Sequence, residues 1–402
     1  MRTSANGAPR HFSCLISHPG LGAGGSEARA MVLLEAFQDR CATTLVTGAP
    51  FEVNRLNRAY HTEVGAAKIA IMTAPTPAIL ANAKGGAAMR GAFFSRFVRQ
   101  VAKDADLCIS AYNFADFGRP GIQFVADFSW DDDVRRAFDP DSPGLRGALQ
   151  RPGVARSAYM GLCSAVAGRP MGPVHRDGDV IVANSRWTAD LLLERHGLAS
   201  RVIYPPVHTA PIQDVVRSQD FVMLGRIAPD KRIVDAIEIL DRVRQRGHVF
   251  DFHIVGEMMD DAYSREVTRK AREAGAWVRL TGGLYGDEKF EFLNRQSFAI
   301  HMRQREAFGI AVAEMVKMGL VPFVPEKSAP AEIVGDESVC FKDSEHAVEV
   351  IDKMLRRPRE IAAVRAGLAK RGEVFSKEAF VMQALELVDE QIGRQPKKDV
   401  FS

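Results

Sequence analysis

The sequence predicts two α/β domains in tandem, each built around a parallel β-sheet. Short β-rich apolar runs alternate with helical patterns along most of the 402 residues, and such alternation is typical of βα units. The predicted strands are almost continuously apolar, which favours sheets covered by helices on both faces. The alternation stops at Tyr204-Pro205-Pro206 and resumes at Phe221, so a linker is predicted between two domains.

The first half contains six predicted strands, and a helix from Ser26 follows the first of them. The strands are expected at residues 11–17, 43–48, 68–74, 104–110, 121–127 and 179–185. Residues 131–178 interrupt the pattern, because they are rich in Gly, Pro and Arg and carry only a helical patch at 154–165. This stretch is predicted to be an elaborated surface region. Its Asp131-Asp132-Asp133 triplet is expected in a solvated loop, with contact to a bound substrate as the alternative.

The second half repeats the alternation as a complete α/β domain, with a helix from Arg232 after its first strand. Strands are expected at residues 220–226, 250–256, 277–283, 297–303, 320–326 and 338–343. From about residue 351 the chain is predicted to be helical.

Composition and charge exclude several classes of protein. The apolar fraction of 46% supports real cores, and the net charge of +3 gives no reason to expect a nucleic-acid surface. Five cysteines without a C-x-x-C pair or a zinc spacing predict reduced, mostly buried thiols. We see no signal peptide and no apolar run long enough to span a membrane. These features predict a cytoplasmic protein.

A glycine-rich turn, Gly20-x-Gly22-x-x-Gly25, follows the first strand. Its spacing is that of a dinucleotide-binding turn, and free N–H groups at a helix start can hold a phosphate. A nicotinamide site also needs an acid at the end of the second strand, about 20 residues further on. Here that strand ends in Val46-Thr47-Gly48, without the acid. The glycines therefore hold a phosphate other than that of NAD, or only form a tight turn.

Gly225-Arg226 follows the first strand of the second half, and Lys231 stands five residues later at a helix start. Ligands of open α/β sheets bind at the carboxyl ends of the strands. Arg226 and Lys231 could neutralise a diphosphate there. The alternative is a pair of solvated surface cations.

Glu306 and Glu314 form the strongest pattern. Glu306 ends the turn after a strand, Gly309 opens a helix, and Glu314 lies within that helix beside apolar residues. Carboxylates accept hydrogen bonds from pairs of hydroxyls, as sugar and ribose diols present them. The free N–H groups at 308–310 are expected to face the same place. The alternative for Glu314 is an ordinary solvent-facing position.

These motifs together resemble the family-4 retaining glycosyltransferases. The resemblance rests on E-x7-E at 306–314, G-R-x4-K at 225–231, G-G-S-E at 24–27 and S-A-P-A-E-I-V at 328–334, in the family's order. Further motifs are similar to the mannosyltransferase subgroup that extends the dolichol-linked oligosaccharide. They are residues 184–188, residues 202–207 and His301-Met302.

The resemblance implies the GT-B fold, in which two Rossmann-like domains face a central cleft and a C-terminal helix crosses back to the first domain. The expected acceptor-binding domain is 1–205, the nucleotide-sugar domain is 206–374, and the returning helix is 375–402. The implied donor is a nucleotide sugar, GDP-mannose or a UDP-sugar. The implied acceptor is a saccharide or a lipid-linked saccharide of cell-surface polysaccharide or glycolipid synthesis. No cofactor and no metal are expected.

Site residues follow from the same motifs. Arg226 and Lys231 would bind the diphosphate and stabilise the leaving group, Glu306 would contact the transferred sugar, and Glu314 would hold the ribose. The remaining expected donor contacts are Gly24, Gly25, Gly225, His301, Phe308, Gly309 and Ile310.

One position departs from the family pattern. Many relatives carry a His after the strand that corresponds to 121–127, where this chain has Ala126 followed by Asp127. Asp127 is expected to replace the His as a polar contact or proton acceptor, or transfer proceeds without one. The departure motivates a second hypothesis, a catalytically weak sugar-nucleotide-binding pseudoenzyme. An NAD-dependent oxidoreductase is a third, which the missing acid disfavours.

Residues 90–103 form a basic amphipathic pattern with Phe93, Phe94 and Phe97 on one face. Such a helix can lie on anionic lipid, so peripheral membrane contact is one expectation. The pattern favours the ordinary alternative, a helix that packs its apolar face on the sheet.

Overall fold

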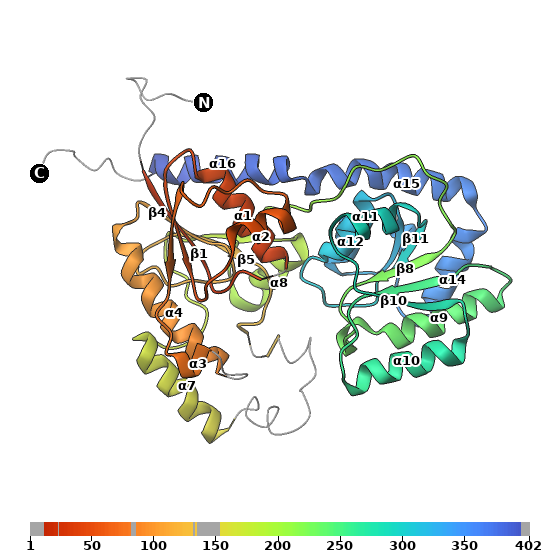
Figure 1. The fold of residues 1–402 in the computed structure, drawn as a ribbon, viewed down its shortest axis with the longest axis horizontal. Helices are drawn as coiled ribbons and strands as arrows, with labels where there is room; N and C mark the ends of the chain where they lie inside the picture. The colour runs from red at the N-terminus through yellow and green to blue at the C-terminus, as the bar shows by residue number, and fades with distance from the viewer. Residues whose placement is uncertain (1–11, 23, 82–85, 132, 135–152, 395–402) are drawn as a thin grey trace, which may run out of the picture. The chain divides into compact units, whose positions relative to one another are not determined.

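A computed structural model describes residues 12–22, 24–81, 86–131, 133–134 and 153–394 (Figure 1). The chain divides into two compact units. The first contains residues 1–184, 191–206 and 377–402, and the second contains residues 185–190 and 207–376. The predicted boundaries at 205/206 and 374/375 differ from these by one or two residues. A segment of the predicted first domain, Ser185–Asp190, is grouped with the second unit.

The first unit is a seven-stranded, all-parallel sheet in the order β3-β2-β1-β4-β5-β6-β7. Its strands are β1 Ser13–His18, β2 Ala42–Thr47, β3 Ile69–Thr73, β4 Leu107–Ser110, β5 Ile122–Val125, β6 Val180–Ala183 and β7 Arg201–Val202. Its helices are α1 Gly25–Phe37, α2 Val53–Tyr60, α3 Ala78–Ala81, α4 Ala87–Val101, α7 Val154–Ala167, α8 Arg186–His196 and α16 Lys377–Arg394. Strand order changes direction between β1 and β4, where such sheets place their ligand crevice.

The second unit is a six-stranded, all-parallel sheet in the order β10-β9-β8-β11-β12-β13. Its strands are β8 Phe221–Leu224, β9 Phe252–Val255, β10 Val278–Gly282, β11 Phe298–Ile300, β12 Val321–Pro325 and β13 Cys340–Phe341. Its helices are α9 Ile233–Gln245, α10 Ala262–Ala274, α11 Gly286–Asn294, α12 Ile310–Lys317, α13 Ala329–Val334, α14 Ser344–Leu355 and α15 Pro358–Gly372. Buried Phe221, Phe298 and Phe323 pack ring against ring across neighbouring strands.

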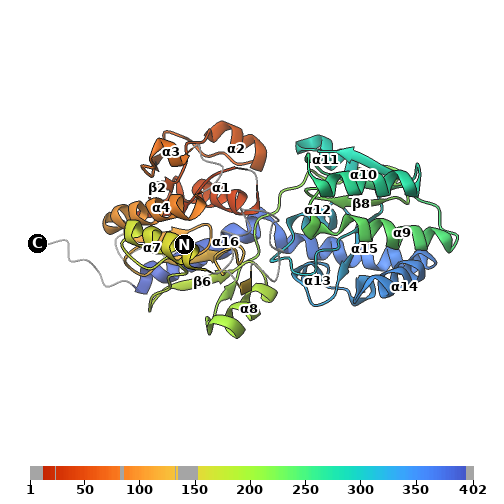
Figure 2. The same ribbon diagram turned by 90° about the horizontal axis from the view of Figure 1, so that it is seen from below.

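Helix α16 completes the core of the first unit, as the fold class predicted. Its Phe380, Ala384, Leu387 and Val388 are buried in one cluster with apolar residues of α1 and of the central strands. Figures 1 and 2 both show this blue helix beside the red helix α1. Removing α16 would therefore expose apolar surface of the first sheet.

Helix α4 packs its apolar side inside the first unit. Val98, with Phe94 and Phe97 beside it, joins the cluster that covers β1, β2 and β4, while Met89 and Ala92 pack with Cys163 and Ala167 of α7. This is the sheet-packing arrangement that the pattern favoured over lipid contact. In the part of the chain that the structure describes, no helix is both long and apolar enough to cross a membrane.

The structure also bears on the predictions for the cysteines and for the aspartate triplet at 131–133. The five cysteines are free thiols, as predicted. Asp131 is not a solvated loop residue, because its side chain is only 9% exposed and lies 2.8 Å from the Nε2 of His196. It also accepts the backbone N–H groups of Asp133 and Val134, so it stabilises a turn. Asp132 and most of the stretch before α7 lie outside the described residues.

Candidate active site in the second unit

The candidate site lies where β8 and β11 end and α12 begins. Gly225 follows β8 with a φ of 147°, a conformation that side chains rarely adopt. Its carbonyl oxygen also lies 1.9 Å from where a Cβ on Gly256 would stand. Gly309, with a φ of 102°, precedes α12, and no side chain caps that helix. The Val312 N–H donates to the Gly309 carbonyl oxygen at 2.9 Å, so the first-turn groups that an anion could use are the N–H groups of Ile310 and Ala311.

Lys231 and Glu306 form a half-buried ion pair at this edge. The Lys231 Nζ donates a hydrogen bond of 2.9 Å to the Oε2 of Glu306, and the side chains are 16% and 17% exposed. Residues 75 positions apart in the sequence are thus brought together. The pairing joins two of the residues that the motifs selected.

Glu306 has further cationic neighbours. The Arg303 guanidinium lies 3.6 Å from its Oε1, and the same NH1 lies 3.2 Å from Asp230. Burial by itself raises the pKa of Glu306, but the charges of Lys231 and Arg303 outweigh it and hold the pKa at about 2. Glu306 is therefore ionised at neutral pH.

His301 is buried beside this pair, with its Nε2 3.9 Å from Glu306. Among the residues that the structure describes, that nitrogen has no hydrogen-bond partner. Burial, and then the positive charge of Lys231, lower the pKa of His301 to about 4. The ring is neutral at pH 7, with one nitrogen free to bond a ligand.

Glu314 lies one helix turn into α12 and has a lysine of its own. The Lys289 Nζ from α11 donates a 2.7 Å hydrogen bond to the Glu314 Oε1, and the side chains are 18% and 13% exposed. Burial raises the pKa of Glu314, and Lys289 offsets that rise only in part. The solvent-facing alternative for Glu314 is wrong, because the side chain is only 13% exposed and its carboxylate is paired with Lys289.

The other predicted donor-contact residues of the second unit are not part of the lysine–glutamate ion pairs. Arg226 is exposed, and among the described residues its side chain takes part in none of the hydrogen bonds or ion pairs of this site. Phe308 is buried and packs edge-on against Phe375 with ring centroids 5.6 Å apart. Ile310 is the first residue of α12.

Three predicted residues lie in the first unit. The carboxylate of Asp127 accepts hydrogen bonds from the Tyr112 hydroxyl (3.1 Å), the Asn113 amide (2.8 Å) and the Ser129 N–H (2.9 Å). It is half-buried and held in place after β5. Such a fixed, hydrogen-bonded carboxylate can orient a hydroxyl group.

The predicted phosphate loop is not fully open. The Gly24 N–H donates to the Tyr60 hydroxyl at 2.8 Å, and that hydroxyl donates to the Gly22 carbonyl at 3.1 Å. A phosphate that used the Gly24 N–H would have to displace Tyr60. Gly25 begins α1.

Sequence patterns missed the partners of the motif residues. Lys289, Arg303, Asp230 and Tyr60 each contact a predicted residue or its immediate neighbour. Arg303 had a signal of its own, since it ends the run 297–303. Lys289 had a weaker one, in the charged first turn of the helix after β10.

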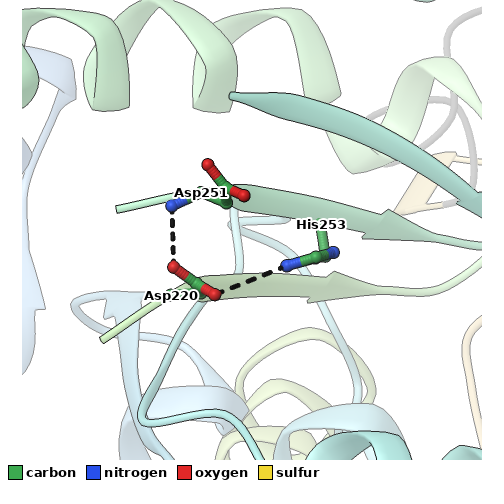
Figure 3. Close-up of side chains that lie close together, drawn as sticks. All are labelled: Asp220, Asp251 and His253. Carbon is green, nitrogen blue, oxygen red and sulfur yellow. Dashed lines mark hydrogen bonds and ion pairs between the residues drawn. The ribbon is translucent and has the colours of Figure 1, made fainter. Parts of the chain in front are cut away.

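A separate cluster is the one group of metal-ligand residue types that the structure brings together within the described ranges. Asp220, Asp251 and His253 lie at the amino ends of β8 and β9, opposite the candidate site, with ligand atoms within 4.8 Å of one another. Figure 3 shows Asp220 between the Asp251 N–H, at 2.8 Å, and the His253 ring, at 3.7 Å. Arg279 donates to Asp251 at 2.7 Å. Both carboxylates of the cluster thus already accept hydrogen bonds from protein groups, and we interpret the cluster as structural.

Comparison with known proteins gives the class. Residues 213–372 match the family model described as glycosyl transferases group 1. Over nearly the whole chain the fold is similar to sucrose-phosphate synthase from Thermosynechococcus elongatus (TM-score 0.67, 13% identity, 96% of this chain and 100% of that chain). It is also similar to Anabaena HepE in complex with UDP and glucose (TM-score 0.64, 16% identity, 94% and 100%). The chain therefore has the GT-B fold, and residues 213–372, in the second unit, match the group 1 glycosyl transferases.

Within that class, the sequence relatives are mannosyltransferases. Human alpha-1,3/1,6-mannosyltransferase ALG2 is 25% identical over 242 residues, which cover 52% of this chain and 58% of the relative. The Dictyostelium discoideum GDP-Man:Man(3)GlcNAc(2)-PP-Dol alpha-1,2-mannosyltransferase is 21% identical over 242 residues, 54% of this chain and 48% of the relative. The chain thus spans about half the length of the curated relatives it matches.

Proposed function

We propose that the protein transfers a hexose, with mannose the first candidate, from a nucleotide-diphosphate sugar to a saccharide or lipid-linked acceptor with retention of configuration. The observation that carries the proposal is the pair of half-buried lysine–glutamate contacts at the carboxyl edge of the second sheet. Mannose is chosen because both sequence relatives are named as mannosyltransferases. Synthesis of a cell-surface polysaccharide or glycolipid is the setting that suits such a transfer.

Each site residue has a role in this proposal. Lys231, with the exposed Arg226 and the N-terminus of α12, offsets the negative charge that grows on the departing diphosphate. Glu306, held ionised by its cations, accepts hydrogen bonds from hydroxyls of the transferred sugar. Glu314 accepts those of the ribose. The remaining contacts with the donor are proposed for Gly225, His301, Phe308, Gly309, Gly24 and Gly25.

The chemical step is an exchange of two bonds at the anomeric carbon. The bond to the diphosphate oxygen breaks as the acceptor oxygen bonds to the same carbon on the same face. The acceptor proton passes to the departing diphosphate oxygen, or to Asp127. The protein supplies the positive charge for the diphosphate itself, so we propose transfer without a metal ion. Transfer that continues unchanged in excess EDTA would support this point.

A binding and turnover panel tests the function. Full-length protein is titrated with GDP-mannose, UDP-glucose, UDP-GlcNAc and NAD while its melting temperature is recorded. A ligand at about 100 times its Kd adds roughly 2.7 kcal/mol to the free energy of unfolding. We expect one sugar nucleotide to stabilise wild type and not Glu314→Ala, and we expect Lys231→Ala to abolish donor hydrolysis.

Other outcomes decide between the alternatives. Binding without turnover in wild type would identify a sugar-nucleotide-binding pseudoenzyme, which the Ala126-Asp127 departure motivates. Stabilisation by NAD alone would contradict the proposal.

A further inference from the structure

The first turn of α8 is grouped with the second unit, although the helix continues into the first. Residues 185–190 belong to the second unit, and 191 onward belongs to the first. This turn rests on the loop that carries Glu306.

Two hydroxyl groups of this turn converge on one carbonyl group. Ser185 Oγ donates to the Ala307 carbonyl oxygen at 2.7 Å, and Thr188 Oγ1 donates to the same oxygen at 2.9 Å. Both side chains are buried, with residue exposures of 1% and 0%. Two donors use both lone pairs of that oxygen, so the Ala307 carbonyl has a fixed direction.

The Ala307 carbonyl belongs to the peptide that joins Ala307 to Phe308. A peptide unit is planar, so fixing its oxygen fixes the direction of the Phe308 N–H on the opposite side. The preceding residue is Glu306, whose carboxylate pairs with Lys231. The two hydroxyls therefore orient the segment that presents both the Glu306 carboxylate and the first amides before α12.

The turn itself is anchored from its other side. The carboxylate of Glu332, in α13, accepts the N–H groups of Arg186 at 2.9 Å and Trp187 at 3.2 Å. Ser185 Oγ also accepts the Thr188 N–H at 3.0 Å. A carboxylate and a hydroxyl thus satisfy the N-terminal amides of α8. The hydroxyl donors are consequently held rigid relative to the Ala307 loop.

We infer that Ser185 and Thr188 are positioning residues for the donor site of the second unit. They act through Ala307 and do not themselves contact the donor. The inference rests on the proposed function, because it assumes that the Glu306 loop binds a sugar nucleotide. A merely structural role would reduce stability and leave donor affinity unchanged well below the melting temperature.

The test compares hydroxyl-deleting and hydroxyl-keeping variants of the full chain. Thr188→Val removes the donor at nearly constant volume, and Thr188→Ser keeps it. Thr268→Val is the matched control, since Thr268 Oγ1 donates to the Ser264 carbonyl at 2.8 Å in α10 of the same unit. Calorimetry at 15 °C measures the Kd of GDP-mannose and UDP-glucose, and a hydrolysis assay separates KM from kcat.

We expect Thr188→Val to weaken binding of the responding nucleotide about tenfold, the scale of one lost hydrogen bond. Thr188→Ser and Thr268→Val should bind as wild type does. Ser185→Ala should weaken binding as well, and it carries the test if Thr188→Val does not fold. Unchanged Kd in both variants would overturn the inference while leaving the proposed function intact.

A second measurement does not depend on the donor. Hydrogen exchange of the peptide covering residues 304–312 should speed up in Thr188→Val and not in Thr268→Val. If exchange there is unchanged, the hydroxyls do not hold the loop, and the inference fails. If wild type binds neither nucleotide while the exchange result holds, the proposed function fails instead.

Discussion

The two glutamates of the E-x7-E motif differ in their electrostatics, although each is half-buried against a lysine. Their exposures are similar, 17% for Glu306 and 13% for Glu314, and their lysine contacts are 2.9 and 2.7 Å. Yet the pKa of Glu306 is lowered and that of Glu314 is raised. Glu306 has Arg303 as a second cation within 4 Å, whereas the charges that oppose the burial of Glu314 are those of its partner Lys289 and of Lys317. The charge of Arg303 beside Lys231 is therefore what tips the pKa of Glu306 downward.

The largest expected effect comes from Lys231→Met. It leaves Glu306 buried with a weaker set of cations, and removing one partner of a buried pair typically costs about 3 kcal/mol of unfolding free energy. It also removes charge from the leaving diphosphate, so donor turnover should fall at least about 100-fold. Urea denaturation and initial rates measure the two effects. The double variant Lys231→Met/Glu306→Gln should recover stability without recovering turnover. If its loss of stability equals the sum of the losses in the two single variants, the pairing is contradicted.

The second-largest expected effect is the contribution of ionised Glu306 to the free energy of unfolding, measured as the pH is lowered. Because its folded pKa is lowered, its ionised form stabilises the fold above pH 4.5, and this contribution is lost as the pH falls through about 2. The gap between the ordinary 4.5 and about 2 corresponds to about 3 kcal/mol at full ionisation. Stability of wild type should therefore fall more steeply than that of Glu306→Gln between these values. Parallel curves would refute the lowered pKa.

Lys289→Met should raise the pKa of Glu314 further above its ordinary value. Without Lys289 the pKa of Glu314 rises more, so the carboxyl stays protonated up to a higher pH, and the protonated form accepts fewer hydrogen bonds. We expect nucleotide affinity to fall about tenfold at pH 7 and to recover as the pH rises. The control is Lys270→Met, whose lysine pairs with the more exposed Glu238. If the nucleotide affinity of Lys289→Met does not depend on pH, the Glu314 carboxylate does not take part in nucleotide binding.

The smallest effect is expected from Arg303→Met, which gives Glu306 the single contacting cation that Glu314 has. The contact is long, 3.6 Å, and Arg303 is shared with Asp230. The pKa of Glu306 should rise, so the acid-unfolding curve should shift to higher pH while stability at pH 7 falls by about 1 kcal/mol. A curve that coincides with wild type would assign the lowered pKa to Lys231 alone.

Local signals in the sequence predicted the fold and the motif residues. Strand and helix periodicity depend on neighbouring residues, and Glu306, Gly309 and Glu314 are close enough in the chain to form one pattern. The partners are different, because Lys289, Ser185 and Thr188 reach the site only through tertiary packing. Ser185 and Ala307 are 122 residues apart, and no spacing rule links them. The hydrogen bond from Gly24 to Tyr60 is missed for the same reason.

The return of α16 to the first sheet has a consequence for synthesis of the chain. The core of the first unit needs Phe380 and Leu387, which leave the ribosome after all of the second unit, whose last residue is Ser376. At about 5 to 20 residues per second, residue 377 follows residue 184 by roughly 10 to 40 s. During that interval the nascent first sheet has an uncovered apolar strip, and at its end the second unit has its whole sequence while α16 is still to be made. The later half of this protein can therefore finish folding before the earlier half, and a chaperone that binds apolar surface would find its target near the N-terminus.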